Sequence, residues 1–217
     1  MKLFLDTADI EEIRAAHGTR LIDGVTTNPT LILRSGRTLP DVAKQLVDEF
    51  PNFESISTEV VADNVADMVN QGLAYKRLGS SITIKLPCTV EGLKACKNLS
   101  NSGIKTNVTL IFSAAQAILA AKAGATYVSP FVGRVDDNSF DGIKLIEEIK
   151  NIYMMNGVET QILAASVRTV RQVTDSFLAG ADIVTLPKAT LDKMYKHILT
   201  DAGLAQFEKD WAQVPKT

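Results

Sequence analysis

The feature that most constrains the fold is a regular alternation of short apolar runs with helical patterns along the whole chain. Eight runs of apolar and β-branched residues are typical of buried strands. They begin at Lys2, Gly24, Ser55, Ile82, Lys105, Thr126, Gln161 and Asp182. Amphipathic helical patterns lie between them, for example at residues 41–50, 62–79, 90–100 and 141–155. Because strands joined through a helix pair in parallel, this alternation predicts a parallel sheet with helical crossovers.

Eight strand–helix units in 217 residues favour a closed (β/α)8 TIM barrel over an open, doubly wound sheet. An open sheet that binds dinucleotides carries a glycine-rich turn after its first strand, and this chain has Asp6-Thr7-Ala8-Asp9 there. No linker rich in serine and glycine marks a second domain. We therefore expect one α/β barrel domain over residues 1–217, with an extra C-terminal helix over residues 201–217.

Composition argues against several classes of function. The net charge is −2 and there is no basic block, so nothing favours nucleic acid or an anionic membrane as a partner. No apolar stretch reaches transmembrane length. Acidic residues directly follow the first strand pattern, so we expect no signal peptide and a cytoplasmic protein. Cys88 and Cys96 match no metal-binding spacing and are expected to be free thiols, while His17 and His197 are too few for a histidine-rich metal site.

Lys85 is the candidate nucleophile. It lies in the strand pattern of residues 82–87, where side chains alternate between the two faces. Ile82 and Ile84 share one face, and Lys85 lies on the other. Partial desolvation near the end of a buried strand favours the neutral amine, which can attack a carbonyl carbon and form a Schiff base. The alternative is a lysine that simply extends to water from the strand end.

Polar side chains collect at the carboxyl ends of the expected strands, where this class of barrel carries its chemistry. A single aspartate or threonine at such a position is usually a cap for the next helix. Here seven strands end in this way, and an acid, a lysine and several hydroxyl groups occur together. In chain order, the residues are Asp6, Thr26, Asn28, Glu59, Lys85, Thr109, Ser129, Phe131 and Ser166. The pattern predicts a functional site at this end of the barrel.

Two arginines suggest what the site binds. Ser166 and Arg168 follow the seventh strand and lead into a helical pattern, which is where this class of barrel commonly binds phosphate. Arg134, in the expected loop after the sixth strand, is suited to a second charge-assisted contact. The alternative is that both arginines pair with loop acids such as Asp136 and Asp137.

The same residues resemble the transaldolase family along nearly the whole chain. The shared motifs are LDTAD from Leu5, GVTTNPT from Gly24, IKLP from Ile84, NVTLIFSAAQA from Asn107, YVSPFVGR from Tyr127, LAASVRT from Leu163 and IVTLP from Ile183. The combination of GVTTNPT, the strand lysine and SPFVGR is highly specific. The short chain resembles the small-subunit branch, which also contains fructose-6-phosphate aldolases. The resemblance implies an enzyme on an eight-stranded α/β barrel that uses no metal and no cofactor.

The resemblance also implies a role for each candidate residue. The position that matches Lys85 forms the Schiff base, and the one that matches Asp6 is the acid and base on the hydroxyl group of the bond that breaks. The positions that match Glu59 and Thr109 hold the catalytic water. Substrate contacts are implied for Thr26, Asn28, Ser129 and Phe131, and phosphate contacts for Arg134, Ser166 and Arg168.

The predicted activity is that of a transaldolase of the pentose phosphate pathway. Such an enzyme moves a dihydroxyacetone unit from sedoheptulose 7-phosphate or fructose 6-phosphate to an aldose phosphate. Aldolases of the branch typically carry Gln and Tyr where this chain has Glu59 and Phe131, and some carry Lys where it has Arg168. A carboxylate can take and return protons, whereas an amide cannot. The alternatives are a fructose-6-phosphate aldolase that releases dihydroxyacetone, and a sugar-phosphate-binding barrel without catalysis.

The C-terminal segment carries one further prediction. Leu204, Phe207, Trp211 and Val214 fall at helical spacing and form a single apolar stripe. One interpretation is that this helix folds back over its own barrel. Transaldolases of the small branch are decamers whose terminal helices reach neighbouring subunits, so the resemblance predicts a homo-oligomer in which this helix docks on an adjacent subunit.

Overall fold

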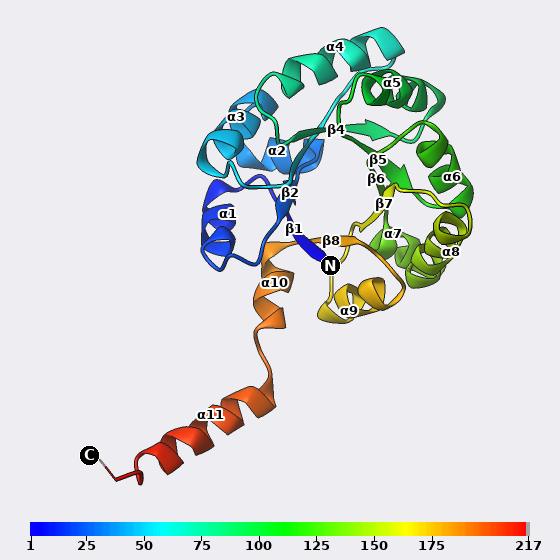
Figure 1. Ribbon diagram of the computed structural model, residues 1–217. Helices are drawn as coiled ribbons and strands as arrows, with labels where there is room; N and C mark the ends of the chain where they lie inside the picture. Colours follow the sequence, from blue (N-terminus) through cyan, green and yellow to red (C-terminus); the bar gives the residue numbers. More distant parts are fainter. Residues whose placement is uncertain (216–217) are drawn as a thin grey trace.

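The structure, a computed structural model, describes residues 1–215. Its centre is a closed barrel of eight parallel strands, in which each strand pairs with the next in sequence and β8 pairs with β1 (Figure 1). The strands are β1 (Lys2–Asp6), β2 (Gly24–Thr26), β3 (Ser55–Glu59), β4 (Ile82–Pro87), β5 (Thr106–Ile111), β6 (Tyr127–Pro130), β7 (Gln161–Ala164) and β8 (Ile183–Leu186). The predicted (β/α)8 barrel is confirmed.

Helices surround the strands and, except for the last one, cover the outer face of the barrel (Figure 1). They are α1 (Ile10–His17), α2 (Pro29–Ser35), α3 (Leu39–Glu49), α4 (Val65–Lys76), α5 (Val90–Asn101), α6 (Ala114–Lys122), α7 (Val132–Asp137), α8 (Gly142–Met155), α9 (Val170–Leu178), α10 (Lys188–Met194) and α11 (Ile198–Trp211). Three strands are each followed by two helices, because α2, α7 and α10 are inserted directly after β2, β6 and β8. The sequence did not predict the short α2 and α7, and Arg134 lies in α7 instead of a loop.

Side-chain caps fix where many of these helices begin. Asp9, Thr89, Ser113 and Thr169 each accept hydrogen bonds from backbone N–H groups in the first turn of α1, α5, α6 and α9, respectively. These N–H groups have no partner within the helix, so each cap satisfies a donor that would otherwise be exposed. Each cap lies in the segment between a strand and the helix that follows it, which places the start of that helix close to the carboxyl end of the barrel.

Apolar side chains fill part of the barrel interior. They form a small cluster separate from the main core, made of Phe4, Tyr127, Leu163, Ala165 and Ile183. Gly24 is required beside this cluster, because a Cβ at this position would lie 2.9 Å from the ring of Phe4 and 2.5 Å from the carbonyl oxygen of Ser55. At the amino end of the barrel, Glu54 accepts hydrogen bonds from Lys2 (2.6 Å) and Tyr127 (3.1 Å). This packing closes the amino end and leaves the carboxyl end open for a site.

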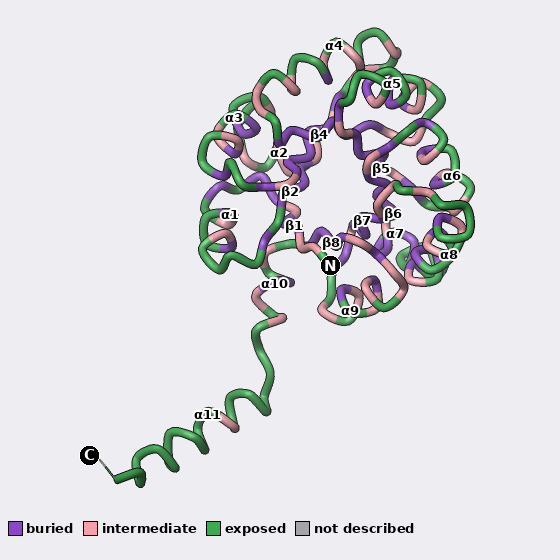
Figure 2. The backbone as a smooth tube through the Cα atoms, viewed as in Figure 1, coloured by how far each residue is buried: buried purple, intermediate pink, exposed green. Residues whose placement is uncertain are grey.

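Helix α11 extends away from the barrel and has no buried residue (Figures 1 and 2). Phe207 is 71% exposed and Trp211 is 76% exposed, so their apolar stripe does not cover the chain's own barrel. The helix begins at Ile198 and ends at Trp211, whereas the sequence predicted residues 201–217, of which 216–217 lie outside the described residues. None of the described helices is long and apolar enough to cross a membrane.

Candidate active site

A cavity of about 90 Å³ opens at the carboxyl ends of the strands. Its lining contains eight of the eleven side chains that the sequence predicted for a site: Asp6, Thr26, Asn28, Lys85, Ser129, Phe131, Arg134 and Ser166. Ala165 and Thr185 complete the lining. Of the other three predicted residues, Glu59 contacts Lys85. Thr109 lies on β5, and Arg168 follows Ser166 in the same loop; neither lines the cavity. The structure therefore brings together residues from across the whole chain.

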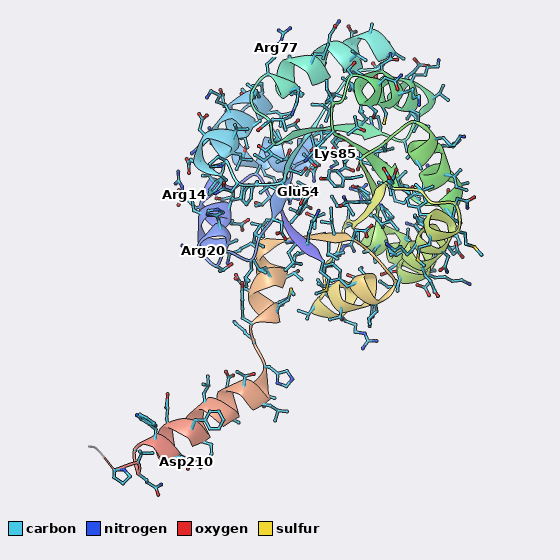
Figure 3. All side chains as sticks on the ribbon, viewed as in Figure 1. Arg14, Arg20, Glu54, Arg77, Lys85 and Asp210 are labelled. Atoms are coloured by element: carbon cyan, nitrogen blue, oxygen red, sulfur yellow. The ribbon has the colours of Figure 1, made fainter. Side chains whose placement is uncertain are left out.

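Lys85 lies inside the ring of strands (Figure 3) and is only 5% exposed. Its ammonium nitrogen is 3.0 Å from Oε2 of Glu59 and donates a hydrogen bond of 3.0 Å to the carbonyl oxygen of Thr27. Glu59 and Lys85 are paired across β3 and β4, so the strand register itself sets this contact. A buried ammonium needs such partners, since an unpaired charge is strongly disfavoured there. The same carboxylate is placed to accept a proton from Lys85.

Asp6 provides a second carboxyl group in the cavity. Burial raises its pKa, while the positive charge of Lys85 and a hydrogen bond from Thr26 act in the opposite direction; the charge of Glu59 raises it further. Thr26 Oγ1 donates to Asp6 at 2.8 Å and lies 2.7 Å from Oγ1 of Thr185. A carboxyl group whose pKa is raised in this way is suited to both accepting and donating protons.

Thr109 has a buried hydroxyl group without a hydrogen-bond partner. Among the described residues, only Thr109 Oγ1 and Ser176 Oγ are buried side-chain oxygen or nitrogen atoms of this kind. The next residue, Leu110, has a φ of +61°, and the pairing of β5 with β6 shifts register between Val108 and Ile111. Bulges of this type redirect side chains at barrel ends. An unpartnered buried hydroxyl group is a natural position for a bound water or a substrate oxygen.

Two polar residues in this region were not predicted as site residues. Asn107 is fully buried, pairs in register with Lys85, donates to Ser57 Oγ (3.3 Å) and accepts from Ser129 Oγ (2.7 Å). Thr185 on β8 lines the cavity and contacts Thr26. Both lie on the inward face of their strands, so strand alternation was the signal that could have identified them.

Aromatic rings and Arg134 form one side of the cavity mouth. The guanidinium carbon of Arg134 lies 4.9 Å from the centroid of the Phe131 ring, and Phe112 packs edge-on against Phe131 at 5.5 Å. Within the part of the chain that the structure describes, Arg134 forms no ion pair with a carboxylate. Its positive charge is therefore available to an anionic ligand at the mouth.

Arg168 differs, because its guanidinium is already paired. Nη1 and Nη2 each donate a hydrogen bond of 2.6 Å to the carboxylate of Asp137, at the end of α7. Arg168 holds the pKa of Asp137 below its usual value through this contact. The pairing with Asp137 was one of the alternatives that the sequence left open. Asp136 instead accepts hydrogen bonds from the backbone of Gly142 (2.9 Å) and the side chain of Gln172 (2.6 Å).

The site contains a buried lysine that pairs with one carboxylate and shares a hydroxyl-rich cavity with a second, and Arg134 lines the same cavity. Glu59 is able to take the proton that Lys85 must lose before its nitrogen can attack carbon. Asp6 is able to exchange a proton with a hydroxyl group bound in the same cavity. This arrangement suits carbonyl chemistry through an amine nucleophile.

The chain is similar to known proteins over nearly its whole length. A family model described as Transaldolase/Fructose-6-phosphate aldolase matches residues 3–217. A protein from Paracoccus denitrificans named "Probable transaldolase" is 52% identical over 215 residues, or 98% of this chain and 97% of that protein. One with the same name from Geobacter sulfurreducens is 52% identical over 216 residues, 100% of each chain. Another, from Sinorhizobium medicae, is 53% identical over 215 residues, 98% of this chain and 97% of that protein.

Proposed function

The chain belongs to the transaldolase/fructose-6-phosphate aldolase family, and we propose that it is a transaldolase. It transfers a dihydroxyacetone unit from a ketose phosphate, such as sedoheptulose 7-phosphate or fructose 6-phosphate, to an aldose phosphate. The observation that carries this proposal is the position of Lys85. It is buried at 3.0 Å from the carboxylate of Glu59, and it lines the same cavity as Asp6. A lysine in this setting forms a Schiff base with a ketone.

The reaction begins at the ketone carbon of the donor. Lys85 passes a proton to Glu59, and its nitrogen adds to the ketone carbon to form a carbinolamine. Protonation of the carbinolamine hydroxyl group by Glu59 allows water to leave, which produces the Schiff base. General acid–base help of this kind is worth roughly 100- to 10,000-fold in rate. The water that leaves, and later returns, is held between Glu59 and the unpartnered hydroxyl group of Thr109.

Asp6 carries out the cleavage step. Its carboxylate takes the proton of the donor hydroxyl group, the carbon–carbon bond breaks, and the aldose phosphate leaves. The electron pair of the broken bond stays with the three-carbon unit, which remains on Lys85 as an enamine. The enamine then attacks the aldehyde carbon of the acceptor, and Asp6 returns the proton to the new hydroxyl group. Hydrolysis of the Schiff base releases the product ketose. The hydrogen bond from Thr26 keeps the Asp6 carboxylate oriented during both steps.

The remaining cavity residues bind the sugar and its phosphate. Asn28 and Ser129 contact the sugar hydroxyl groups, and Phe131 packs against the carbon chain. Arg134 and Ser166, which line the cavity mouth, bind the phosphate together with Arg168. Planar guanidinium groups suit phosphate because they offer paired hydrogen bonds.

Glu59 and Phe131 favour transfer over simple cleavage. A carboxylate at position 59 is able to handle protons in both directions, and a phenyl ring at position 131 provides no hydroxyl group to support hydrolytic release. The second candidate, a fructose-6-phosphate aldolase, shares every step up to the enamine. A third candidate is a sugar-phosphate-binding barrel without catalysis. It is disfavoured because Glu59 contacts Lys85, and Asp6 lines the same cavity as Lys85.

We further propose that the enzyme works in the cytoplasm, in the pentose phosphate pathway, as a homo-oligomer. The exposed stripe of α11 supports the last point, since Phe207 and Trp211 leave a large apolar surface uncovered in the single chain.

Borohydride trapping combined with a transfer assay tests the proposal. With fructose 6-phosphate, reduction should attach one adduct to the peptide that contains Lys85, and Lys85→Met should abolish it. Adding erythrose 4-phosphate should produce sedoheptulose 7-phosphate faster than free dihydroxyacetone appears. An adduct on another lysine, or activity in the Lys85→Met variant, would refute the mechanism. Release of dihydroxyacetone as the main product would favour the aldolase instead.

A further inference from the structure

We propose that Asp137 is a positioning residue for phosphate recognition, which holds Arg168 so that the Nε edge of its guanidinium faces Ser166 and the mouth of the cavity. The inference rests on the proposed function, because it concerns how that site distinguishes phosphorylated from unphosphorylated sugars.

The first observation is the geometry of the ion pair. Both terminal nitrogens of Arg168 bond to the two oxygens of Asp137, each at 2.6 Å, so the carboxylate meets the guanidinium end-on. A guanidinium has five N–H groups in a fixed plane. An end-on carboxylate uses two of them and fixes the plane, which leaves the Nε–H edge for a second anion. Within the described residues, Arg168 Nε forms no hydrogen bond.

The second observation is where this free edge lies. Gly133 has no side chain, and a Cβ at this position would be 3.0 Å from Nε of Arg168 and 3.3 Å from Oγ of Ser166. Nε and the Ser166 hydroxyl group are both close to Gly133, so they lie near each other on the same side of α7. Ser166 lines the cavity, and its backbone is held at a φ of +58°. An Nε–H group and a hydroxyl group that lie this near each other are able to bind two oxygens of one phosphate.

The third observation is the spacing of Gly133 and Asp137 on α7. Residues four positions apart lie on the same face of a helix. The glycine leaves room for Arg168 to approach, and the aspartate one turn later binds its terminal nitrogens. Position 133 has no room for a larger residue, because a Cβ there would also lie 2.2 Å from the carbonyl oxygen of Ser166.

Two other roles for Asp137 predict different results. If the pair only ties α7 to the loop before α9, it is a half-exposed surface ion pair, and such pairs contribute little to stability. Substrates with and without phosphate would then respond alike to its loss. If Asp137 merely competes with phosphate for Arg168, removing its negative charge should tighten phosphate binding. A positioning role alone predicts weaker binding that is confined to phosphorylated ligands.

The test is Asp137→Asn, which keeps the shape and removes the charge. We expect the KM for fructose 6-phosphate to rise roughly five- to tenfold, in line with the loss of one well-oriented charge-assisted contact. The ratio of kcat/KM for fructose 6-phosphate to kcat/KM for unphosphorylated fructose should fall by the same factor. The matched control is Asp175→Asn, which removes the same charge from an Arg–Asp pair of 2.6 Å on α9 and should leave this ratio at its wild-type value.

A double-mutant cycle and a binding measurement complete the test. In an Arg168→Lys background, which cannot form the paired contact, Asp137→Asn should change the ratio less than twofold. Titration with inorganic phosphate, followed by calorimetry, should show that Asp137→Asn binds phosphate more weakly than wild type. If wild type turns over neither sugar, the proposed function is refuted, but this difference in phosphate binding should remain. An unchanged or tighter phosphate affinity in Asp137→Asn, or wild-type protein that binds no phosphate, overturns this inference.

Discussion

Asp6 lies in the candidate active site, and its side chain is in contact with Thr26. Its carboxyl group is buried, and burial raises its pKa despite the nearby ammonium group of Lys85 and the hydrogen bond from Thr26. The folded state therefore holds the Asp6 proton to a higher pH than the unfolded state does. As the pH rises from the unfolded value of 3.8 through the raised folded value, the free energy of unfolding falls, because the folded state must then ionise a buried group.

Asp6→Asn should accordingly stabilise the protein at neutral pH while abolishing transfer. The amide is neutral at every pH, so the penalty of ionisation disappears. We expect a higher melting temperature than wild type at pH 7, and a difference that shrinks as the pH is lowered toward 4. Thermal unfolding measured across this range checks the sign. Asp48→Asn, which alters an exposed carboxylate paired with Lys44, is the control and should show no such gain. A variant less stable than wild type at pH 7 would contradict the argument.

Phe131→Tyr should raise aldolase activity relative to transferase activity. The added hydroxyl group would reach into the cavity that Phe131 lines and would help water to release the three-carbon unit from Lys85. The measurement is the ratio of free dihydroxyacetone to transferred product with fructose 6-phosphate and erythrose 4-phosphate. Phe112→Tyr is a suitable control, because this ring packs on Phe131 but does not line the cavity. A ratio that does not move would remove Phe131 as a determinant of the reaction type.

The start of α9 connects the cap of this helix to the candidate active site. Thr169 and Gln172 form a capping box, in which Thr169 Oγ1 accepts from the Gln172 backbone (3.1 Å) and the Gln172 side chain accepts from the Thr169 backbone (3.3 Å). The Gln172 side chain also accepts from the backbone of Arg168 at 2.9 Å. The cap that begins the helix therefore also fixes the residue proposed to bind phosphate.

Thr169→Ala should destabilise the protein by about 1 kcal/mol, a typical value for the loss of a helix N-cap. In a chain of this length that corresponds to a decrease in melting temperature of about 2–4 °C. Thr169→Ser keeps the hydroxyl group and should remain near wild type. Chemical denaturation of the three proteins measures the difference. Equal loss in both variants would mean that the methyl group of Thr169, and not its hydroxyl group, supports the helix.

Helix α11 is not packed against the barrel. It extends into solvent and leaves Phe207 and Trp211 exposed, although burial of a large apolar side chain is worth about 1.5–3 kcal/mol. An adjacent subunit would recover this free energy. The exposed stripe is the feature of the single chain that argues most directly for assembly.

Removal of residues 198–217 should therefore reduce the mass of the particle in solution. Light scattering on the full chain should give an oligomer, and on the truncated chain a smaller species. The pair Phe207→Ala and Trp211→Ala should act in the same direction, whereas Gln206→Ala on the same helix should leave the mass unchanged. A full chain that is a monomer would refute the assembly, and an unchanged oligomer after truncation would refute the role of α11.

The barrel, and the rim at which its polar residues lie, could be predicted from local patterns in the amino-acid sequence. All eight strands were predicted, because apolar runs with β-branched residues alternate with helical patterns and both periods are local properties of the chain. Strand alternation placed Lys85 inward, and parallel strands end at one rim, so Asp6, Lys85 and Ser129 were expected in one place. They line the same cavity.

Which of these groups contact one another depends on how the folded chain packs. The contact of 3.0 Å between Lys85 and Glu59, the pairing of Arg168 with Asp137, and the exposure of α11 each depend on the relative placement of residues far apart in the chain. The bulge at Leu110 also escaped prediction, because a leucine in the left-handed region is stabilised by its surroundings and not by its own preference. Local periodicity fixes the direction of a side chain, whereas packing across the barrel fixes its partner.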